Sequence, residues 1–222
     1  MSLAYRIARR ELRGGIRGFR VFLACLALGV AAIAGVGTLR AGIQSGLADQ
    51  GAIILGGDAE MRFTYRAADA TELAHIAAIS TTHSEVYDFR SMAVIDGDET
   101  LTQVKAVDAA WPLTGAAVLE PAIPVAQALA IMDPVLIERL GLTVGDSFRL
   151  GTQDFRLTAA LIREPDSASA GFTLGPRSVV RTSALANSGL LAPGALFETR
   201  YRMTLPAGAD LAALETEAET KF

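Results

Sequence analysis

The stretch "RGGIRGFRVFLACLALGVAAIAGVGTLR", residues 13–40, separates a basic N-terminus from the rest of the chain. Its 19 residues from Val21 to Leu39 carry no charge and are closed by Arg20 and Arg40. A helix needs about 20 apolar residues to cross the hydrocarbon core of a bilayer. At about 1.5 Å per residue, this run would cover roughly 28 Å as a helix. Its length therefore favours a membrane-spanning helix.

Two other interpretations of this run stay open. A signal peptide usually has an apolar region of about 7–15 residues. Here the run is longer, and a helical pattern continues after "AGVG" and Arg40, although "ARRELRG" weakly resembles a twin-arginine signal. The core helix of a soluble domain is the third interpretation, and the arginines that precede the run make it the least favoured.

Charge is distributed unevenly along the 222 residues. Residues 1–40 hold seven arginines and one glutamate, a net charge of +6, whereas residues 41–222 hold 13 basic and 23 acidic residues, a net charge of −10. Because basic residues stay on the cytoplasmic side of a span, we expect a cytoplasmic N-terminus and an acidic body outside the membrane from about residue 41. The arginines that set this topology precede the span: Arg6, Arg9, Arg10, Arg13, Arg17 and Arg20.

The basic segment itself, residues 1–19, has two interpretations. Leu3, Ile7 and Leu12 fall near one helical face, which is typical of a helix lying on the cytoplasmic leaflet. An ordinary arginine-rich flank is the alternative. Nucleic-acid binding is not expected, because the arginines adjoin an apolar run instead of a groove-reading element.

Small residues recur on one side of the predicted span. Ala27, Ala31 and Gly35 are four residues apart and so share a helical face. Small residues at this spacing let helices approach closely in lipid. We expect packing against further transmembrane helices or a second copy of the protein, although an alanine-rich helix also gives such a stripe by chance.

The helical pattern continues beyond the span. Val36, Leu39, Ile43 and Leu47 keep the spacing of one helical face. We therefore predict a span with an outward extension over residues 20–50, which could transmit movement; a plain linker is the alternative.

Residues 51–222 alternate between strand and helix patterns. We expect strands at 59–65, on both sides of "DGDE", at 147–150, at 155–163 after a "GTQD" turn, in "TLGPRSVVRT" at 173–182, and in "LFETRYRMTLP". We expect helices at 69–80, capped by Asp69 or Thr71, after Asp133, in "TSALANSGL" and in the C-terminal "ADLAALETEAETKF". Hairpins mixed with separate helices indicate an α+β body. The last helix has no stop signal, so we expect residues 51–222 to be an incomplete domain of a longer protein.

Residues that would carry catalysis are not grouped in the sequence. Cys25 is the one cysteine and lies in the apolar run, and His75 and His83 show no zinc spacing. Lys105 and Lys221, the two lysines, do not follow glycine, so there is no P-loop for ATP. The acidic side chains that stand at caps and turns are Asp133, Asp146 and Asp154. We expect no catalytic, cofactor-binding or metal-binding residue.

The order of segments resembles the FtsX-like, MacB-type permeases of ABC transporters. Three stretches carry the resemblance: "LGGDAE" at 55–60, "LGLTVGDSFRLG" at 140–151 with its flanking helix and strand, and "REPD", "GFTLGPRSVV" and "SGLLAPGALFETRYRM" between 163 and 203. The later segments are closer to the YbbP-like branch. The resemblance implies a transmembrane helix extended into a mixed α+β, MacB-like periplasmic core domain.

The resemblance also implies function. Such permeases are multi-pass proteins of the bacterial inner membrane that work with a separate ABC ATPase subunit, which binds the ATP. They carry out export, extraction or mechanotransmission, with a periplasmic partner or a lipid-like substrate. The alternative is a single-pass, membrane-anchored binding or sensor module, and a secreted enzyme is a third, less favoured reading.

Overall fold

A computed structural model describes residues 16–166, 175–186, 188–192 and 194–222, without the side chains of residues 16–18, 44–50, 53 and 54. The chain divides into two compact units, Met1–Asp49 and Gln50–Phe222. Arg6, Arg9, Arg10 and Arg13 lie outside the described residues, as does the side chain of Arg17.

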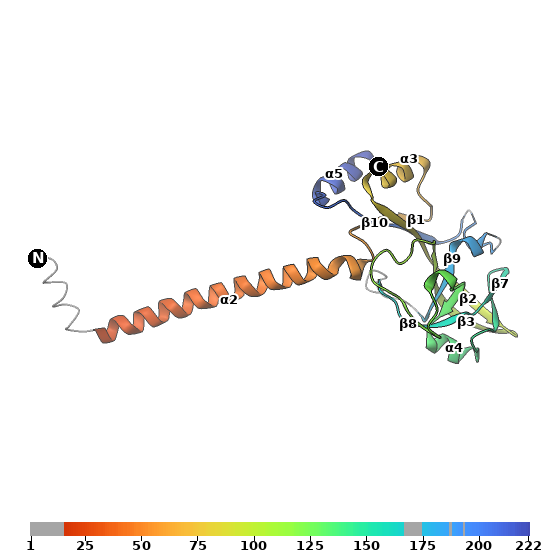
Figure 1. Cartoon of the computed structure of the whole chain (residues 1–222), viewed down its shortest axis with the longest axis horizontal. Coiled ribbons are helices and arrows are strands. Elements are labelled where there is room, and N and C mark those ends of the chain that lie inside the picture. Colours follow the sequence, from red (N-terminus) through yellow and green to blue (C-terminus); the bar gives the residue numbers. More distant parts are fainter. Residues whose placement is uncertain (1–15, 167–174, 187, 193) are drawn as a thin grey trace, which may run out of the picture. The chain divides into compact units, whose positions relative to one another are not determined.

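The first unit is dominated by α2, a 40-residue helix at Ile16–Leu55 (Figure 1). Its segment Phe19–Ile43 is long and apolar enough to cross a membrane. Apolar side chains point outward all along this segment, including Leu28 and Ile33 at 75% and 77% exposure. The last residues of α2, from Gln50 onward, belong to the second unit.

The second unit is a mixed sheet with short helices, so the α+β class expected from the sequence is confirmed. The described strands are β1 (Ala59–Thr64), β2 (Thr82–Ile95), β3 (Asp98–Val107), β4 (Val118–Glu120), β5 (Ala130–Met132), β6 (Ser147–Leu150), β7 (Gln153–Arg156), β8 (Ala159–Arg163), β9 (Arg177–Arg181) and β10 (Phe197–Thr204). The helices are α3 (Ala70–Ile79), α4 (Pro134–Arg139) and α5 (Leu211–Lys221), with 3-10 turns η1 (Val125–Gln127) and η3 (Thr182–Leu185).

The strand order is β1-β10-β2-β3-β9-β5-β8-β4, and β6 pairs with both β2 and β7. Strands β1, β10, β2 and β3 are antiparallel neighbours, whereas β9 runs parallel to β3. The order brings β10, near the end of the chain, between the two strands β1 and β2 that come first. Segments distant in the sequence therefore share one sheet face.

The hairpin of β2 and β3 is formed as predicted. Asp96 and Gly97 have φ values of 51° and 97° and join Ile95 to its partner Asp98. Two central residues with positive φ give the tight turn whose twist matches that of the strands. The "DGDE" stretch is thus a turn between long strands.

Helix α3 also begins where the sequence indicates. Asp69 accepts hydrogen bonds from the backbone N–H groups of Thr71 and Glu72, and the Glu72 carboxylate accepts one from the N–H of Asp69. This reciprocal pair is a capping box. The apolar pattern of Leu73, Ile76, Ala77 and Ile79 predicts the buried face of this helix only in part. Ile76 is buried and Ile79 packs against the same cluster, whereas Leu73 and Ala77 are exposed and Glu72 and His75 are buried instead. Burial of Glu72 is possible because Arg66 binds its carboxylate at 2.6 Å.

Several predicted boundaries are wrong. The strand expected at 59–65 ends at Thr64, because Tyr65 turns to a φ of 62°. The expected "GTQD" turn is shorter than predicted, because β7 already begins at Gln153. The strand expected at 155–163 is broken between β7 and β8, since the Leu157 N–H donates to Asp146 and the Thr158 N–H to Ala130. The helix expected from Thr182 is a four-residue 3-10 turn. The short strands β4 and β5 were not predicted.

Three apolar clusters hold the second unit together. The largest lies between one sheet face, α4 and the β6–β7 hairpin, and includes Phe89, Leu136 and Phe148. A second cluster surrounds Trp111 and Ile131. The third includes Phe63, Ile76, Tyr201 and Met203, from β1, α3 and β10.

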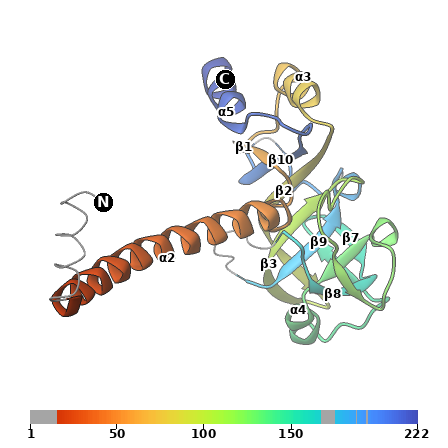
Figure 2. The same ribbon diagram turned by 60° about the vertical axis from the view of Figure 1, so that its left-hand side comes forward.

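Helices α3 and α5 lie side by side near β1 and β10 (Figures 1 and 2). The rings of His75 and Phe222 are 5.4 Å apart, and the Lys221 amine is 3.3 Å from His75 Nδ1. These contacts fix the position of the C-terminal helix against α3.

Candidate functional site

The end of α2 is bound closely to the sheet of the second unit. Gly56 has a φ of +82°, and a Cβ placed there would lie 2.9 Å from Asp166 Cβ and 3.1 Å from Arg202 Cδ. A Cβ on Gly57 would lie 2.8 Å from the carbonyl oxygen of Met203. The next residue, Asp58, donates its N–H to that same carbonyl at 2.8 Å. The two glycines therefore let the backbone run directly over β10.

Beneath this junction lies a buried group of charges. The Lys105 amine, on β3, donates to Glu164 at 2.5 Å and to Asp166 at 2.6 Å. Arg177, at the start of β9, binds Glu164 at 2.7 Å, and Arg202 of β10 binds Asp166. None of these five side chains is more than 9% exposed. Burial of charge on this scale requires pairing, and here each carboxylate has two cationic partners.

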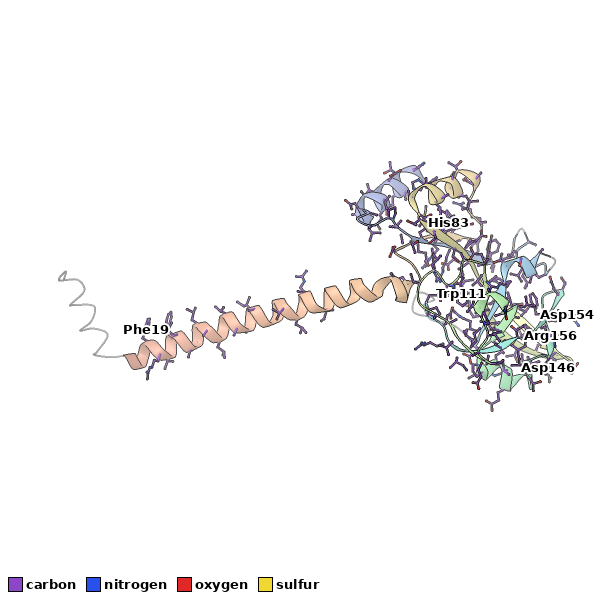
Figure 3. The ribbon with its side chains drawn as sticks, viewed as in Figure 1. Phe19, His83, Trp111, Asp146, Asp154 and Arg156 are labelled. Carbon is purple, nitrogen blue, oxygen red and sulfur yellow. The ribbon has the colours of Figure 1, made fainter. Side chains whose placement is uncertain are left out.

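The single tryptophan completes this buried group. Trp111 Nε1–H donates to Asp166 at 3.3 Å, and the Lys105 amine lies 5.1 Å from the centre of the indole ring. Trp111 lies in the interior of the second unit, apart from the β6–β7 region that carries Asp146, Asp154 and Arg156 (Figure 3). Asp166 thus accepts from a lysine, an arginine and an indole at once.

The pairing continues across the sheet without a break. Arg202 also binds Glu60 at 3.1 Å, and Glu60 binds Arg62 at 3.1 Å. Arg62 binds Glu198 at 2.7 Å, and Glu198 binds Arg200 at 3.2 Å. Arg200 then reaches Asp88 at 3.6 Å. We call these ten residues the ion-pair chain: Arg177, Glu164, Lys105, Asp166, Arg202, Glu60, Arg62, Glu198, Arg200 and Asp88.

Strand geometry explains why so many charges meet. Successive side chains of a strand point to opposite faces, so residues two apart share a face. The register pairs Glu60 with Arg202 and Arg62 with Arg200 across β1 and β10, and Asp88 with Lys105 across β2 and β3. The ion-pair chain holds five cations and five carboxylates, so its formal charges cancel.

The environment shifts the pKa values of the buried members. Burial lowers the pKa of Lys105 to about 8, although Glu164 acts in the opposite direction. Burial acts to raise the pKa of Glu164, but Lys105 and Arg177 outweigh it, so this pKa lies below its ordinary value. Glu164 is therefore ionised at neutral pH and holds both cations.

A second buried polar contact stabilises the opposite face of the same strands. The hydroxyls of Tyr87 and Tyr201 both donate to Glu85, at 2.8 and 2.5 Å. Burial and these hydrogen bonds raise the pKa of each phenol. Both phenols therefore stay protonated at neutral pH and act as donors to Glu85.

The residues singled out from the sequence lie outside the ion-pair chain. Ala27, Ala31 and Gly35 lie in the candidate span segment of α2 and are exposed, and their packing role stays a prediction. Arg20, the one topology arginine with a described side chain, is also exposed. The structure confirms the local roles of Asp133, which caps α4, Asp146, which accepts from Thr143, and Asp154, which pairs with Arg149 in a hairpin.

The ion-pair chain was not predicted from the sequence. A partial signal is present, because charged residues alternate with uncharged ones in "FETRYRM" at 197–203 and in "AEMRF" at 59–63. Alternation predicts a polar face, but not that the face is covered by Glu164, Asp166 and the end of α2.

Comparison with known proteins gives one sequence relative and several similar folds. No protein-family model matches the chain. It is 28% identical over 179 residues to "Uncharacterized ABC transporter permease YbbP" of Escherichia coli (strain K12), which confirms the resemblance expected from the sequence. The match covers 80% of this chain but 22% of the relative, so the chain corresponds to a small part of that protein's length.

Three solved structures are similar at low sequence identity. A domain of a putative permease protein from Porphyromonas gingivalis has a TM-score of 0.46 at 14% identity, covering 77% of each chain. The periplasmic region of MacB from Actinobacillus actinomycetemcomitans gives 0.44 at 8%, covering 74% of this chain and 83% of that one. The extracellular domain of the noncanonic ABC-type transporter YknZ from Gram-positive bacteria gives 0.46 at 10%, covering 70% and 78%.

Proposed function

We propose that this chain is part of the permease subunit of an ABC transporter in a bacterial inner membrane. In this proposal α2 spans the membrane, the N-terminus is cytoplasmic and residues from about 41 onward are periplasmic. The observation that carries the proposal is the similarity to an ABC transporter permease over 80% of the chain. The candidate span and the +6 charge before it support the orientation.

Energy comes from a separate subunit in this proposal. An ABC ATPase on the cytoplasmic side binds and hydrolyses ATP, and the lack of a P-loop in these 222 residues is compatible with this division. The face formed by Ala27, Ala31 and Gly35 packs against further transmembrane helices of the full-length protein or against a second permease copy. Export or extraction of a lipid-like substrate, or action on a periplasmic partner, is the resulting activity.

The proposed mechanism transmits movement through the ion-pair chain. Gly56 lies against Asp166 and Arg202, and these residues are linked by charge pairs to β1, β3, β9 and the segment after β8. Paired buried charges resist separation, because each would otherwise be left unpaired in a low-dielectric interior. A displacement of the end of α2 is therefore expected to move several strands together.

Membrane topology gives a direct test. Cys25 is the only cysteine, so Cys25→Ser provides a background for single introduced cysteines. Ala109→Cys, at an exposed position after β3, is expected to react with a membrane-impermeant maleimide on intact spheroplasts. Ser2→Cys is the matched control and is expected to react only after lysis. The opposite pattern would exclude the proposed orientation.

Coupling is tested with the full-length protein and its ABC ATPase in proteoliposomes. Leu55→Cys, in the Cys25→Ser background, labels the exposed last residue of α2. ATP is expected to change its labelling rate, and Asp166→Asn is expected to reduce that change while ATP hydrolysis continues. Asp154→Asn, in an exposed pair, is the control and should behave as the wild type. An unchanged labelling rate with ATP in the wild type would contradict transmission through α2.

A further inference from the structure

One end of the ion-pair chain, at Asp88, lines a cavity. Neither the fold nor the proposed transport mechanism gives this cavity a role. This cavity, of about 520 Å³, is lined by the ends of β1 and β10 and by the middle of β2 and β3. Its polar lining includes Asp88, Arg90, Gln103 and Glu198, and its rim includes Tyr65 and Leu196. We call it the Asp88 groove. Its size is within the range of pockets that hold small organic ligands.

A buried acceptor in the Asp88 groove has no donor. Asp88 is 7% exposed, and its Oδ2 faces Arg200 at 3.6 Å. Its Oδ1 is buried and receives no hydrogen bond from any residue that the structure describes. Buried carboxylate oxygens are rarely left without a donor, because desolvation is not then compensated. The position therefore calls for a donor from beyond the described residues, and a ligand in the groove can supply it.

Two further polar side chains in the Asp88 groove are unused. Arg90 and Gln103 face each other in the β2–β3 register. Over the described ranges, no hydrogen bond or ion pair involves either side chain, and Arg90 is exposed. Glu198 differs, because Arg62 and Arg200 already bind it. The groove thus offers one buried anionic acceptor and one free guanidinium.

The spacing of these groups limits the ligand. Asp88 and Arg90 are two residues apart on one strand and so share a face at a separation of roughly 6.6 Å along the backbone. The groove is neutral overall, because its two carboxylates, Asp88 and Glu198, balance its two guanidinium groups, Arg90 and Arg200. A neutral ligand with separated charges matches this arrangement. An ammonium group suits the carboxylate, and a phosphate suits the guanidinium, which binds it with two parallel hydrogen bonds.

The rim of the groove is strained and apolar. Tyr65 has a φ of 62°, which is unusual for a bulky residue, and its N–H donates to the Phe197 carbonyl at 2.8 Å. Tyr65 and Leu196 are 62% and 72% exposed, although both adjoin the groove. An exposed aromatic ring favours a nearby ammonium group, and exposed apolar surface favours an attached hydrocarbon.

We propose that the Asp88 groove binds an ammonium–phosphate zwitterion, with the ammonium at Asp88 and the phosphate at Arg90 and Gln103. The zwitterion is either a free phosphoethanolamine or the same group at the head of a lipid. This site does not depend on the proposed transport function, and it can be tested without an ATPase.

Binding is measured by isothermal titration calorimetry on the full chain in detergent. O-phosphoethanolamine is expected to bind at least tenfold more tightly than ethanolamine or inorganic phosphate alone. Phosphocholine, whose quaternary nitrogen has no N–H to donate to Asp88 Oδ1, is expected to bind more weakly. Equal affinity for inorganic phosphate and phosphoethanolamine, or no binding at millimolar concentration, would overturn the proposal.

Variants locate the site. Arg90→Gln is the decisive change, because Arg90 is exposed and unpaired among the described residues, so its replacement should leave folding intact. It is expected to weaken phosphoethanolamine binding at least tenfold, and Asp88→Asn is expected to do the same. Arg139→Gln, an exposed arginine on α4, is the control and should bind as the wild type. Unchanged binding by Arg90→Gln would overturn the site.

The source of the zwitterion is distinguished with a short-chain lipid. Dihexanoyl phosphatidylethanolamine, below its micelle concentration, is compared with O-phosphoethanolamine. Tighter binding of the lipid that is lost in Leu196→Ser identifies a lipid headgroup as the ligand. Equal or weaker binding of the lipid identifies the free zwitterion.

Discussion

The candidate span segment of α2 and the charged face of the sheet both depart from the usual distribution of side chains. The helix exposes apolar side chains, and the sheet buries charged ones. Leu28 and Ile33 of α2 are 75% and 77% exposed, whereas the side chains of Lys105 and Asp166 are 1% exposed. Apolar side chains are normally inside and charges outside. Among the described residues, the buried charges of the sheet have partners, whereas the apolar side chains of this helix segment have no cover. The two regions should therefore respond differently to substitution.

The largest expected effect comes from removing the shared carboxylate of the sheet. Asp166→Ala leaves Lys105, Arg202 and the Trp111 indole without their common acceptor. We expect a loss of about 3–5 kcal/mol in the free energy of unfolding, since one member of a buried charge group is removed. Chemical denaturation of the chain in detergent measures it. Asp154→Ala removes a partner from an exposed pair and should show no measurable change.

A smaller effect is expected at the junction of α2 with the sheet. Gly56→Ala combines a backbone φ of +82° with a Cβ that would lie 2.9 Å from Asp166 Cβ. Gly97→Ala also has a positive φ, +97°, but its Cβ would meet no atom within 4 Å. We expect about 1–2 kcal/mol of destabilisation from the backbone alone at Gly97. Gly56→Ala should cost clearly more, and equal losses in the two variants would show that the helix end is not closely packed.

The pH dependence of stability tests the buried lysine. The pKa of Lys105, about 8, is below its ordinary value of 10.5, so the unfolded chain holds more protons between these values. Stability should therefore rise from pH 8 toward pH 10 relative to Lys105→Met, which lacks the group. Subtracting the stability of Lys105→Met from that of the wild type at each pH removes the contribution of the tyrosines, because both proteins contain them. Lys221→Met, at an exposed amine, should follow the wild type, and a flat difference for Lys105→Met would show that the lysine is not desolvated.

The smallest effect on stability is expected in the span. Ala31→Leu with Gly35→Leu enlarges an exposed face and should leave the unfolding of the second unit unchanged. Association with other transmembrane helices should fall, as measured by co-purification of two differently tagged copies of the full-length protein or of its ATPase. Gly29→Leu, on the opposite side of the helix, is the control. Equal loss in the control would show that the small-residue stripe has no special role.

The contrast between the helix and the sheet also explains which features could be predicted from the sequence. The helix of the span, the Asp96–Gly97 turn and the Asp69 cap depend on residues close in the chain, and local chemistry predicts them. The ion-pair chain depends on register, because β10 lies between β1 and β2 and brings Arg202 to Glu60 across 142 residues. Short strands such as β5 are formed by their neighbours in the sheet, since three residues carry too little pattern of their own.

Trp111 gives the second unit an optical property that follows from its position. It is the only tryptophan of the chain, and its indole is bound to Asp166 with the Lys105 amine close to the ring. Intrinsic fluorescence excited at the red edge of protein absorption therefore originates from one place, directly beneath the end of α2. Its emission colour and lifetime report the polarity of that place alone, so the chain carries its own probe of the junction without any added label.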